Sequence, residues 1–177
     1  MLQELIILPV KMAKLLRKNA KRLLKSAWML LWLACVSCGN SNLVDKKQMK
    51  RVITDVLQKL GDKYATPDAI DLVYNTGLVE SKYVYLMQKG GSNIARGFFQ
   101  IEPWTSVDCI KNYLFYRPEL MKDVSRASNV DLKYFTDPKD EDWKFILTTN
   151  IAAQVVMCRM HWRRIPERLP KTLEEQA

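Results

Sequence analysis

Apolar residues recur at helical spacing in two successive stretches between residues 45 and 80. In the first stretch they are Met49, Val52, Ile53, Val56, Leu57 and Leu60, and Gly61 follows. In the second they are Ile70, Val73, Tyr74, Gly77 and Leu78. Steps of three and four residues place side chains on one face of a helix. Thr66 followed by Pro67 is typical of a helix start, so we predict one helix over 45–60 and a second from Thr66.

The pattern changes between residues 83 and 102. A turn cluster, KGGSN at 89–93, is flanked by short apolar runs at 83–87 and 98–101. Glycine and asparagine interrupt regular structure and favour turns. We therefore expect a small hairpin or irregular lobe here.

The helical pattern then resumes. Thr105 and Asp108 have the spacing of a capping box and predict a helix through Leu114; a connection over 117–139 holds a short helix at 118–124. One long helix is predicted over 140–163, ended by Pro166 and Pro170. Its inward face comprises Trp143, Ile146, Leu147, Ile151, Val155, Cys158 and Trp162. The fold class is thus α+β and mostly α-helical, with a small β-like insertion, in a domain over 45–177.

The N-terminal residues 1–37 have a separate character. A basic stretch runs to Lys25, and ten apolar residues, AWMLLWLACV, follow at 27–36. This run is too short for a bilayer span, which needs about 20 residues, and fits the apolar region of a secretory signal. With the SCGN that follows, it resembles a bacterial lipoprotein signal in which Cys38 is lipidated. The alternatives are an uncleaved, basic amphipathic membrane anchor, or neither.

The basic charge of the chain does not indicate nucleic-acid binding. The formal net charge is +9. Seven basic residues and one acidic residue lie in residues 1–37, a net of +6, which leaves +3 for the remainder. The basic charge therefore belongs mostly to the N-terminal residues and says little about the folded part.

The cysteines and the single histidine are the candidate metal ligands and redox groups of the chain. In an exported protein Cys109 and Cys158 would either pair or stay as two buried free thiols. No cluster of Cys and His has metal-ligand spacing, and the only histidine, His161, is expected at the surface or a helix end. We therefore expect no metal and no cofactor.

Glu80, in the stretch GLVESKY, is the first candidate for chemistry. It follows Val73 by seven residues and Gly77 by three, so it lies at the edge of the apolar stripe. Partial desolvation there would raise the pKa of its carboxyl group, as a general acid requires. Gly77 would leave room for a substrate. Alternatively Glu80 extends into solvent or pairs with Lys82 or Arg96.

Glu80-Ser81, followed by GFFQIEP at 97–103, resembles the Glu-Ser and Gly-Leu-Met-Gln-Ile signatures of soluble lytic transglycosylases and goose-type lysozymes. The longer runs ARGFFQIEPWTSVDCIKNYLFYRPEL and TTNIAAQVVMCRMHWRRIP are similar to phage-encoded members. The resemblance covers about 46–170. It implies a lysozyme-like domain that cleaves peptidoglycan between N-acetylmuramic acid (MurNAc) and N-acetylglucosamine (GlcNAc).

The resemblance also implies roles for individual residues. Glu80 matches the catalytic acid/base and Ser81 the small polar residue beside it. The substrate-binding candidates are Ser81, Gly97, Phe98, Phe99, Gln100, Ile101 and Asn150, where Asn150 is either a cleft residue or a helix-packing amide. Gly97 would let the backbone approach the glycan, and Gln100 would bond an acetamido group. One or two of Tyr83, Tyr85, Phe98, Phe99 and Trp104 would stack on sugars.

A glycosidase with two carboxylates needs a second acid, for which Glu102 and Asp108 are the candidates. Asp108 has the capping role given above and Glu102 precedes a proline, so we expect the single-glutamate transglycosylase route, in which the muramoyl 6-hydroxyl replaces water and a 1,6-anhydro product forms.

The family carries a later Tyr-Asn segment, and this chain ends at KTLEEQA before one; we expect a shortened domain or a substitute element. The alternative is a non-catalytic wall-binding or virion structural protein on a degenerate lysozyme-like fold. A third hypothesis is a basic membrane-active segment fused to a scaffold. The transglycosylase hypothesis implies a monomer that is exported to the periplasmic side of a bacterial membrane. Its partner would be glycan strands, and residues 1–37 would contact the membrane.

Overall fold

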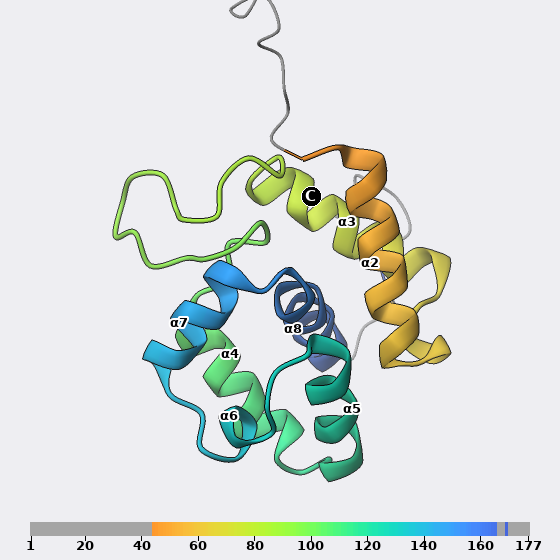
Figure 1. Cartoon of the computed structure of the whole chain (residues 1–177), viewed down its shortest axis with the longest axis vertical. Coiled ribbons are helices and arrows are strands. Elements are labelled where there is room, and N and C mark those ends of the chain that lie inside the picture. Colours follow the sequence, from red (N-terminus) through yellow and green to blue (C-terminus); the bar gives the residue numbers. More distant parts are fainter. Residues whose placement is uncertain (1–43, 166–168, 170–177) are drawn as a thin grey trace, which may run out of the picture. The chain divides into compact units, whose positions relative to one another are not determined.

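The computed structural model describes residues 44–165 and 169. The predicted signal or anchor segment and Cys38 lie outside these residues. The described part is mostly helical (Figure 1). Its elements are α2 (Lys46–Leu60), a 3₁₀ turn (Asp62–Tyr64), α3 (Pro67–Glu80), α4 (Pro103–Cys109), a π-helical turn (Ile110–Leu114), α5 (Pro118–Ser128), α6 (Lys133–Thr136), α7 (Asp140–Thr149) and α8 (Ile151–Arg164).

The first two helices begin where the sequence predicts. The Asp45 carboxylate accepts the backbone N–H of Gln48 at 2.9 Å, and the Thr66 hydroxyl accepts that of Ala69 at 3.3 Å. These bonds satisfy donors that lack partners inside the helix. Gly61 ends α2 with φ of 134°, a value that favours glycine.

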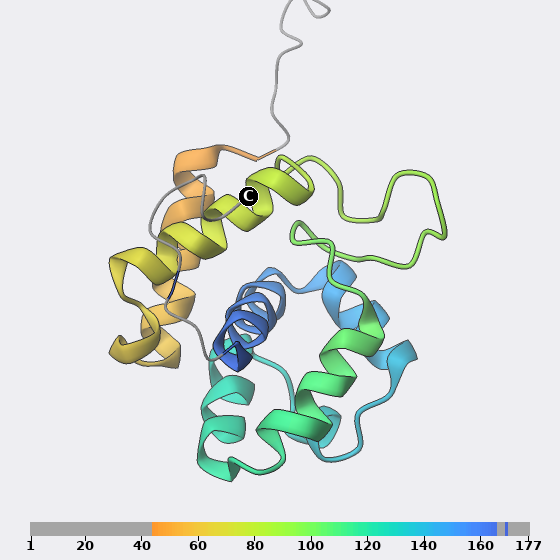
Figure 2. The ribbon, with the colours of Figure 1, turned by 180° about the vertical axis from the view of Figure 1, so that it is seen from behind.

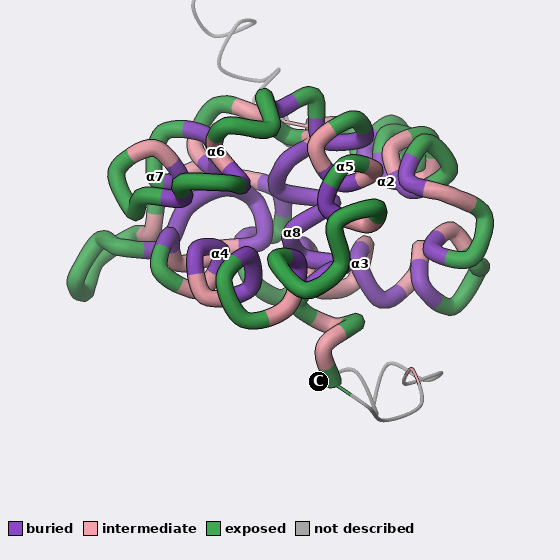
Figure 3. Tube along the Cα trace, turned by 90° about the horizontal axis from the view of Figure 1, so that it is seen from below, coloured by how far each residue is buried: buried purple, intermediate pink, exposed green. Residues whose placement is uncertain are grey.

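Helix α8 forms the centre of the core. Its residues 153–160 are all buried, and it packs against α2, α3, α4, α5 and α7. Figures 1 and 2 show α8 between the α2–α3 pair and α4, and Figure 3 shows its buried stretch in purple. Because α8 packs against both α3 and α4, its side chains are placed to line a site that forms between these two helices.

The prediction of one long helix over 140–163 is wrong, because the chain breaks at Asn150. Asn150 has extended φ and ψ of −117° and 102°, so α7 ends before it and α8 begins after it. Its side-chain oxygen accepts the N–H of Ala153 at 3.0 Å, and its amide nitrogen donates to the carbonyl of Ser128 at 3.0 Å. Ile151, predicted to face inward, is 37% exposed.

Residues 81–102 form an irregular segment rather than paired strands. The only β pairing among the described residues is two isolated antiparallel bridges, Met87 with Arg96 and Arg96 with Ile101. A β insertion is therefore not confirmed. Positive φ at Gly90, Gly91 and Asn93 turns the chain too tightly for a longer ladder.

Helix α4 begins at Pro103, two residues before the predicted capping box. Asp108 instead lies within the helix. Its carboxylate accepts a hydrogen bond from the Asn112 amide at 2.6 Å and forms an ion pair with Arg164 at 2.7 Å. Helix α5 also runs further than predicted, to Ser128, and Asn129 ends it in the left-handed conformation. Within the described residues, no helix combines the length and apolar character that a bilayer crossing requires.

Candidate active site

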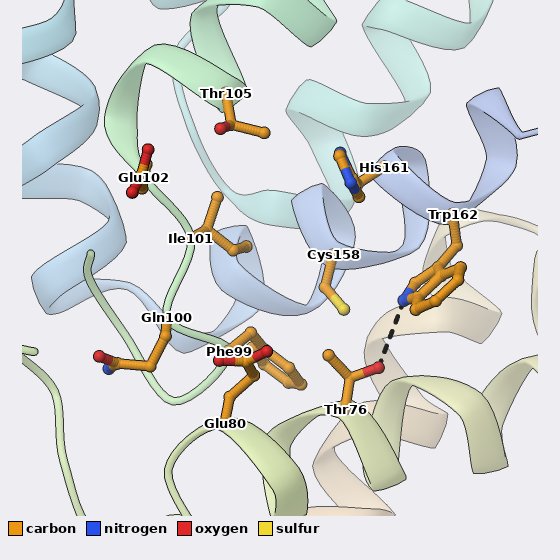
Figure 4. A pocket seen from close by; sticks show the side chains of 10 residues that line it. All are labelled: Thr76, Glu80, Phe99, Gln100, Ile101, Glu102, Thr105, Cys158, His161 and Trp162. Carbon is orange, nitrogen blue, oxygen red and sulfur yellow. Dashed lines mark hydrogen bonds between the residues drawn. The ribbon is translucent and has the colours of Figure 1, made fainter. Parts of the chain in front are cut away.

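A pocket of about 360 Å³ opens beside the C-terminal end of α3, near the lower end of the range typical of small-molecule sites. Three parts of the chain line it: α3, the segment from residue 99 to the first turn of α4, and α8 (Figure 4). The lining residues are Thr76, Glu80, Phe99, Gln100, Ile101, Glu102, Thr105, Cys158, His161 and Trp162.

Glu80 is the last residue of α3 and lines this pocket. The residue is exposed, yet desolvation by the surrounding protein raises the pKa of its carboxyl group, the direction expected from its place on the helix. Neither proposed ion pair exists among the described residues. Arg96 is buried, and its guanidinium donates to the carbonyl oxygens of Asn93 and Ala95 at 2.7 and 2.8 Å. Lys82 forms no ion pair with any residue that the structure describes.

Ser81 fixes the chain that follows Glu80. Its buried hydroxyl donates to the carbonyl oxygen of Phe98 at 2.6 Å, and it accepts the N–H of Tyr83 at 3.1 Å. Ser81 does not line the pocket, but it joins the end of α3 to the 97–101 segment. It therefore holds the two predicted motifs together without facing the cavity.

Gly77 makes room for a tyrosine and not for a substrate, which corrects the sequence interpretation. A Cβ atom at Gly77 would lie 2.5 Å from the ring of Tyr83. The ring reaches this place because Lys82 and Tyr83 both have positive φ and turn the chain back onto α3. The Tyr83 hydroxyl then donates to the carbonyl of Tyr74 at 2.6 Å.

Gly97 is likewise close to protein, at the site predicted to approach a glycan. Its φ is +72°, and a Cβ there would lie 2.4 Å from the side chain of Gln154. The side-chain oxygen of Gln154 accepts the N–H of Phe98 at 2.9 Å, so α8 holds the segment from behind. Gly97 and Phe98 are buried and outside the pocket lining.

The remaining predicted binding residues divide between core and pocket. Phe98 packs edge-on to Tyr83 in the core, with ring centroids 5.7 Å apart, whereas Phe99 and Ile101 line the pocket. Gln100 also lines it, but its amide points away from Glu80 in Figure 4 and donates to the carbonyl of Gly97 at 2.7 Å. Asn150 caps α8 and is not among the lining residues.

Helix α8 supplies lining residues that the sequence reasoning did not assign to the site. The Trp162 indole donates to the Thr76 hydroxyl at 3.2 Å and so joins α8 to α3 (Figure 4). His161 is exposed near the helix end, as predicted, and desolvation and the nearby Arg164 lower the pKa of its imidazole. Helical spacing already places Cys158 with His161 and Trp162 on one face; only the packing of α8 against α3 directs that face to Glu80.

Of the two candidate second carboxylates, only Glu102 lines the pocket. It is the residue preceding α4, and its carboxylate accepts a hydrogen bond from the indole N–H of Trp104. Asp108 is not a lining residue, and the hydrogen bond from Arg164 lowers the pKa of its carboxyl group. The pocket therefore contains two carboxylates. Within the part of the chain that the structure describes, Glu102 has a hydrogen-bond donor and Glu80 has none.

The cysteines are buried free thiols, so the disulfide alternative is not met. Burial raises the pKa of Cys109 to about 11 and that of Cys158 to about 12. Both thiols are therefore protonated near neutral pH and are poor nucleophiles. Within residues 44–165 and 169, no group of three or more His, Cys, Asp or Glu side chains has the arrangement of a metal site.

Comparison of the chain with protein-family models, curated proteins and solved structures finds no match.

Proposed function

We propose that this chain is a peptidoglycan lytic transglycosylase that cleaves the MurNAc–GlcNAc β-1,4 bond with Glu80 as its single acid/base. The observation that carries the proposal is a carboxylate at the edge of a pocket, with a raised pKa and no ion-pair partner among residues 44–165 and 169. A general acid works best when its pKa lies near the operating pH. Desolvation moves the pKa of Glu80 upward, toward that range.

The reaction requires two proton transfers at one carboxyl group. Protonated Glu80 gives its proton to the glycosidic oxygen as the bond from that oxygen to C1 of MurNAc breaks. The 6-hydroxyl of the same sugar then bonds to C1, and the Glu80 carboxylate accepts its proton. Glu80 ends protonated, no water is consumed, and the products are a 1,6-anhydro end and a free 4-hydroxyl.

Glu102 is assigned a supporting role. Its carboxylate is held by the Trp104 indole N–H and lies at the N-terminus of α4, where a negative charge is favourable. A residue with such a local role does not need to act as a second catalytic acid. If it did act as one, the reaction would be hydrolysis and the product would have a reducing end.

A lysozyme-like arrangement of the domain is part of the same proposal. Its support is the order of the elements: Glu80 ends a helix, an irregular segment follows, and the Ser81–Phe98 hydrogen bond returns that segment to the glutamate. Export to the periplasmic side of a bacterial membrane, as a monomer tethered through residues 1–37, belongs to the proposal because the glycan lies there.

The test is digestion of purified murein followed by muropeptide analysis. Wild type should release 1,6-anhydro muropeptides, and Glu80→Gln should reduce the rate at least a hundredfold. The matched control is Glu119→Gln, an exposed glutamate that pairs with Lys122 on α5, which should cleave at the wild-type rate. Equal release by wild type and Glu80→Gln would refute the assignment. Murein pull-down without turnover would indicate the non-catalytic wall-binding alternative.

A further inference from the structure

A second cavity has a volume of about 300 Å³. It is formed by the loop at residues 92–94, the start of α4 and the first turns of α7, and α4 and α7 pack against each other. Its lining includes Asn93, Ile94, Trp104, Asp140 and Glu141. We call this cavity the Trp104 pocket.

The Trp104 indole is exposed but held in place. The residue is 56% exposed, whereas tryptophan is highly buried on average. Its N–H is bonded to the Glu102 carboxylate, which fixes one edge of the ring and leaves much of its surface in solvent. Ile94, 42% exposed, adds apolar surface to the same cavity.

Glu102 and Trp104 connect the two cavities. Glu102 lines the pocket that contains Glu80, and Trp104 lines the second one. The Trp104 indole N–H donates to the Glu102 carboxylate, so two residues in direct contact line the two cavities.

The lining of the Trp104 pocket suits a sugar. A sugar ring has an apolar face of C–H groups and a rim of hydroxyls. A fixed indole provides a flat apolar surface with a polar edge, and the Asn93 amide and the Asp140 and Glu141 carboxylates provide acceptors for hydroxyl groups. The two carboxylates also lie in the first turn of α7, where they stabilise the helix. The indole and the cavity have no such structural role.

We propose that the Trp104 pocket is a second carbohydrate subsite, which binds an N-acetylated sugar of the same glycan strand whose bond is cleaved beside Glu80. This inference rests on the proposed function. It adds a length requirement: a short oligosaccharide fills only the Glu80 pocket, whereas a longer one fills both. Occupation of the second subsite would help to hold a strand in place during cleavage.

Binding can be measured without cleavage, in a full-length Glu80→Gln protein. GlcNAc dimers and hexamers are titrated by calorimetry against this parent and against Trp104→Ala, Trp104→Phe and Tyr116→Ala made in it. Tyr116 is 71% exposed and lines neither cavity, so it is the matched control. We expect Trp104→Ala to weaken hexamer binding at least tenfold and leave dimer binding unchanged. Trp104→Phe should retain most of the hexamer affinity, because the flat face remains.

Equal hexamer affinity of Trp104→Ala and its parent, no saccharide binding by the parent, or equal loss of dimer and hexamer binding would each overturn the subsite. Thermal unfolding of each variant shows that it is folded. The proposed function is judged separately, by Glu80-dependent cleavage of murein. Cleavage combined with an unchanged hexamer affinity would refute the subsite alone, and a Trp104-dependent hexamer affinity without cleavage would refute the enzyme alone.

Discussion

The hydroxyl of Ser81 lies 2.6 Å from the carbonyl oxygen of Phe98, to which it donates a hydrogen bond across 17 residues of sequence. Both residues are buried, with 3% and 2% of their surfaces exposed. This bond brings the end of α3, with Glu80, to the segment whose next residues line the pocket. The position of the carboxylate relative to Phe99 and Ile101 therefore depends on a residue outside the cavity.

Ser81→Ala should lower the free energy of unfolding by about 1–3 kcal/mol, because it leaves the Phe98 carbonyl and the Tyr83 N–H without their partner in a buried place. Urea denaturation measures this. Thr149→Ala, an exposed residue whose hydroxyl bonds only within its own helix, should change the value by less than about 0.5 kcal/mol. Equal effects of the two variants on the free energy of unfolding would show that the Ser81–Phe98 hydrogen bond does not stabilise the protein.

Gly77→Ala should destabilise the protein by about 1–3 kcal/mol, because the new methyl group would overlap the Tyr83 ring. The direction of this stability change is informative, because alanine normally stabilises a helix interior relative to glycine by about 1 kcal/mol. Thermal unfolding gives the comparison, with the exposed Val79→Ala as control. A higher melting temperature for Gly77→Ala would show that the space beside Gly77 is open, as the sequence interpretation had it.

The raised pKa of Glu80 predicts a pH dependence of both stability and activity. The folded state holds this proton more tightly than the unfolded state, whose pKa is near 4.5. Stability therefore falls as pH rises through the interval between the unfolded and folded pKa values. Glu80→Gln should match wild type below that interval and be more stable above it, by urea denaturation at several pH values. Cleavage should also decline as pH rises through the folded pKa, since protonated Glu80 is the reacting form.

The Asp108–Arg164 ion pair predicts a stability that changes with pH in the opposite direction to that of Glu80. Arg164 lowers the pKa of Asp108 in the folded state, so the pair stabilises at pH values above the unfolded pKa of about 3.8 and loses this effect as pH falls through the folded one. Asp108→Asn should cost about 0.5–1 kcal/mol at pH 7 and nothing at about pH 2. Asp55→Asn, on an exposed face of α2, serves as control; a pH-independent loss in Asp108→Asn would exclude the ion pair as cause.

Asn150→Ala should lower the free energy of unfolding by about 1–2 kcal/mol through loss of the α8 cap. Asn150→Asp keeps the capping oxygen but not the donor to Ser128, and should lose less. If Asn150 is a cap only, murein cleavage by both variants should equal that of wild type under conditions where all are folded. A fall in the cleavage rate without a fall in stability would indicate that Asn150 binds substrate in the cleft.

Some site features follow from local sequence. The start of α3 at Thr66-Pro67 and the place of Glu80 at the edge of the apolar stripe could be predicted, because caps and helix faces depend on residues three or four positions apart. The raised pKa of Glu80 has the predicted direction for the same reason. The lone break at Asn150 was missed because apolar residues on both sides continue nearly the same helical phase.

The sequence by itself determined where α2 and α3 begin, which residues the two motifs contain and that Glu80 lies at the edge of the apolar stripe of α3. Tertiary structure alone decided that Tyr83 fills the space beside Gly77, that Gln154 lies behind Gly97, that Asn150 divides α7 from α8, and that α8 and Glu102 complete the pocket. The physical reason is distance along the chain. The first set depends on hydrogen bonds and periodicity within one or two helical turns, whereas the second depends on contacts such as Gln154 with Phe98, 56 residues apart, which form only when the whole core packs.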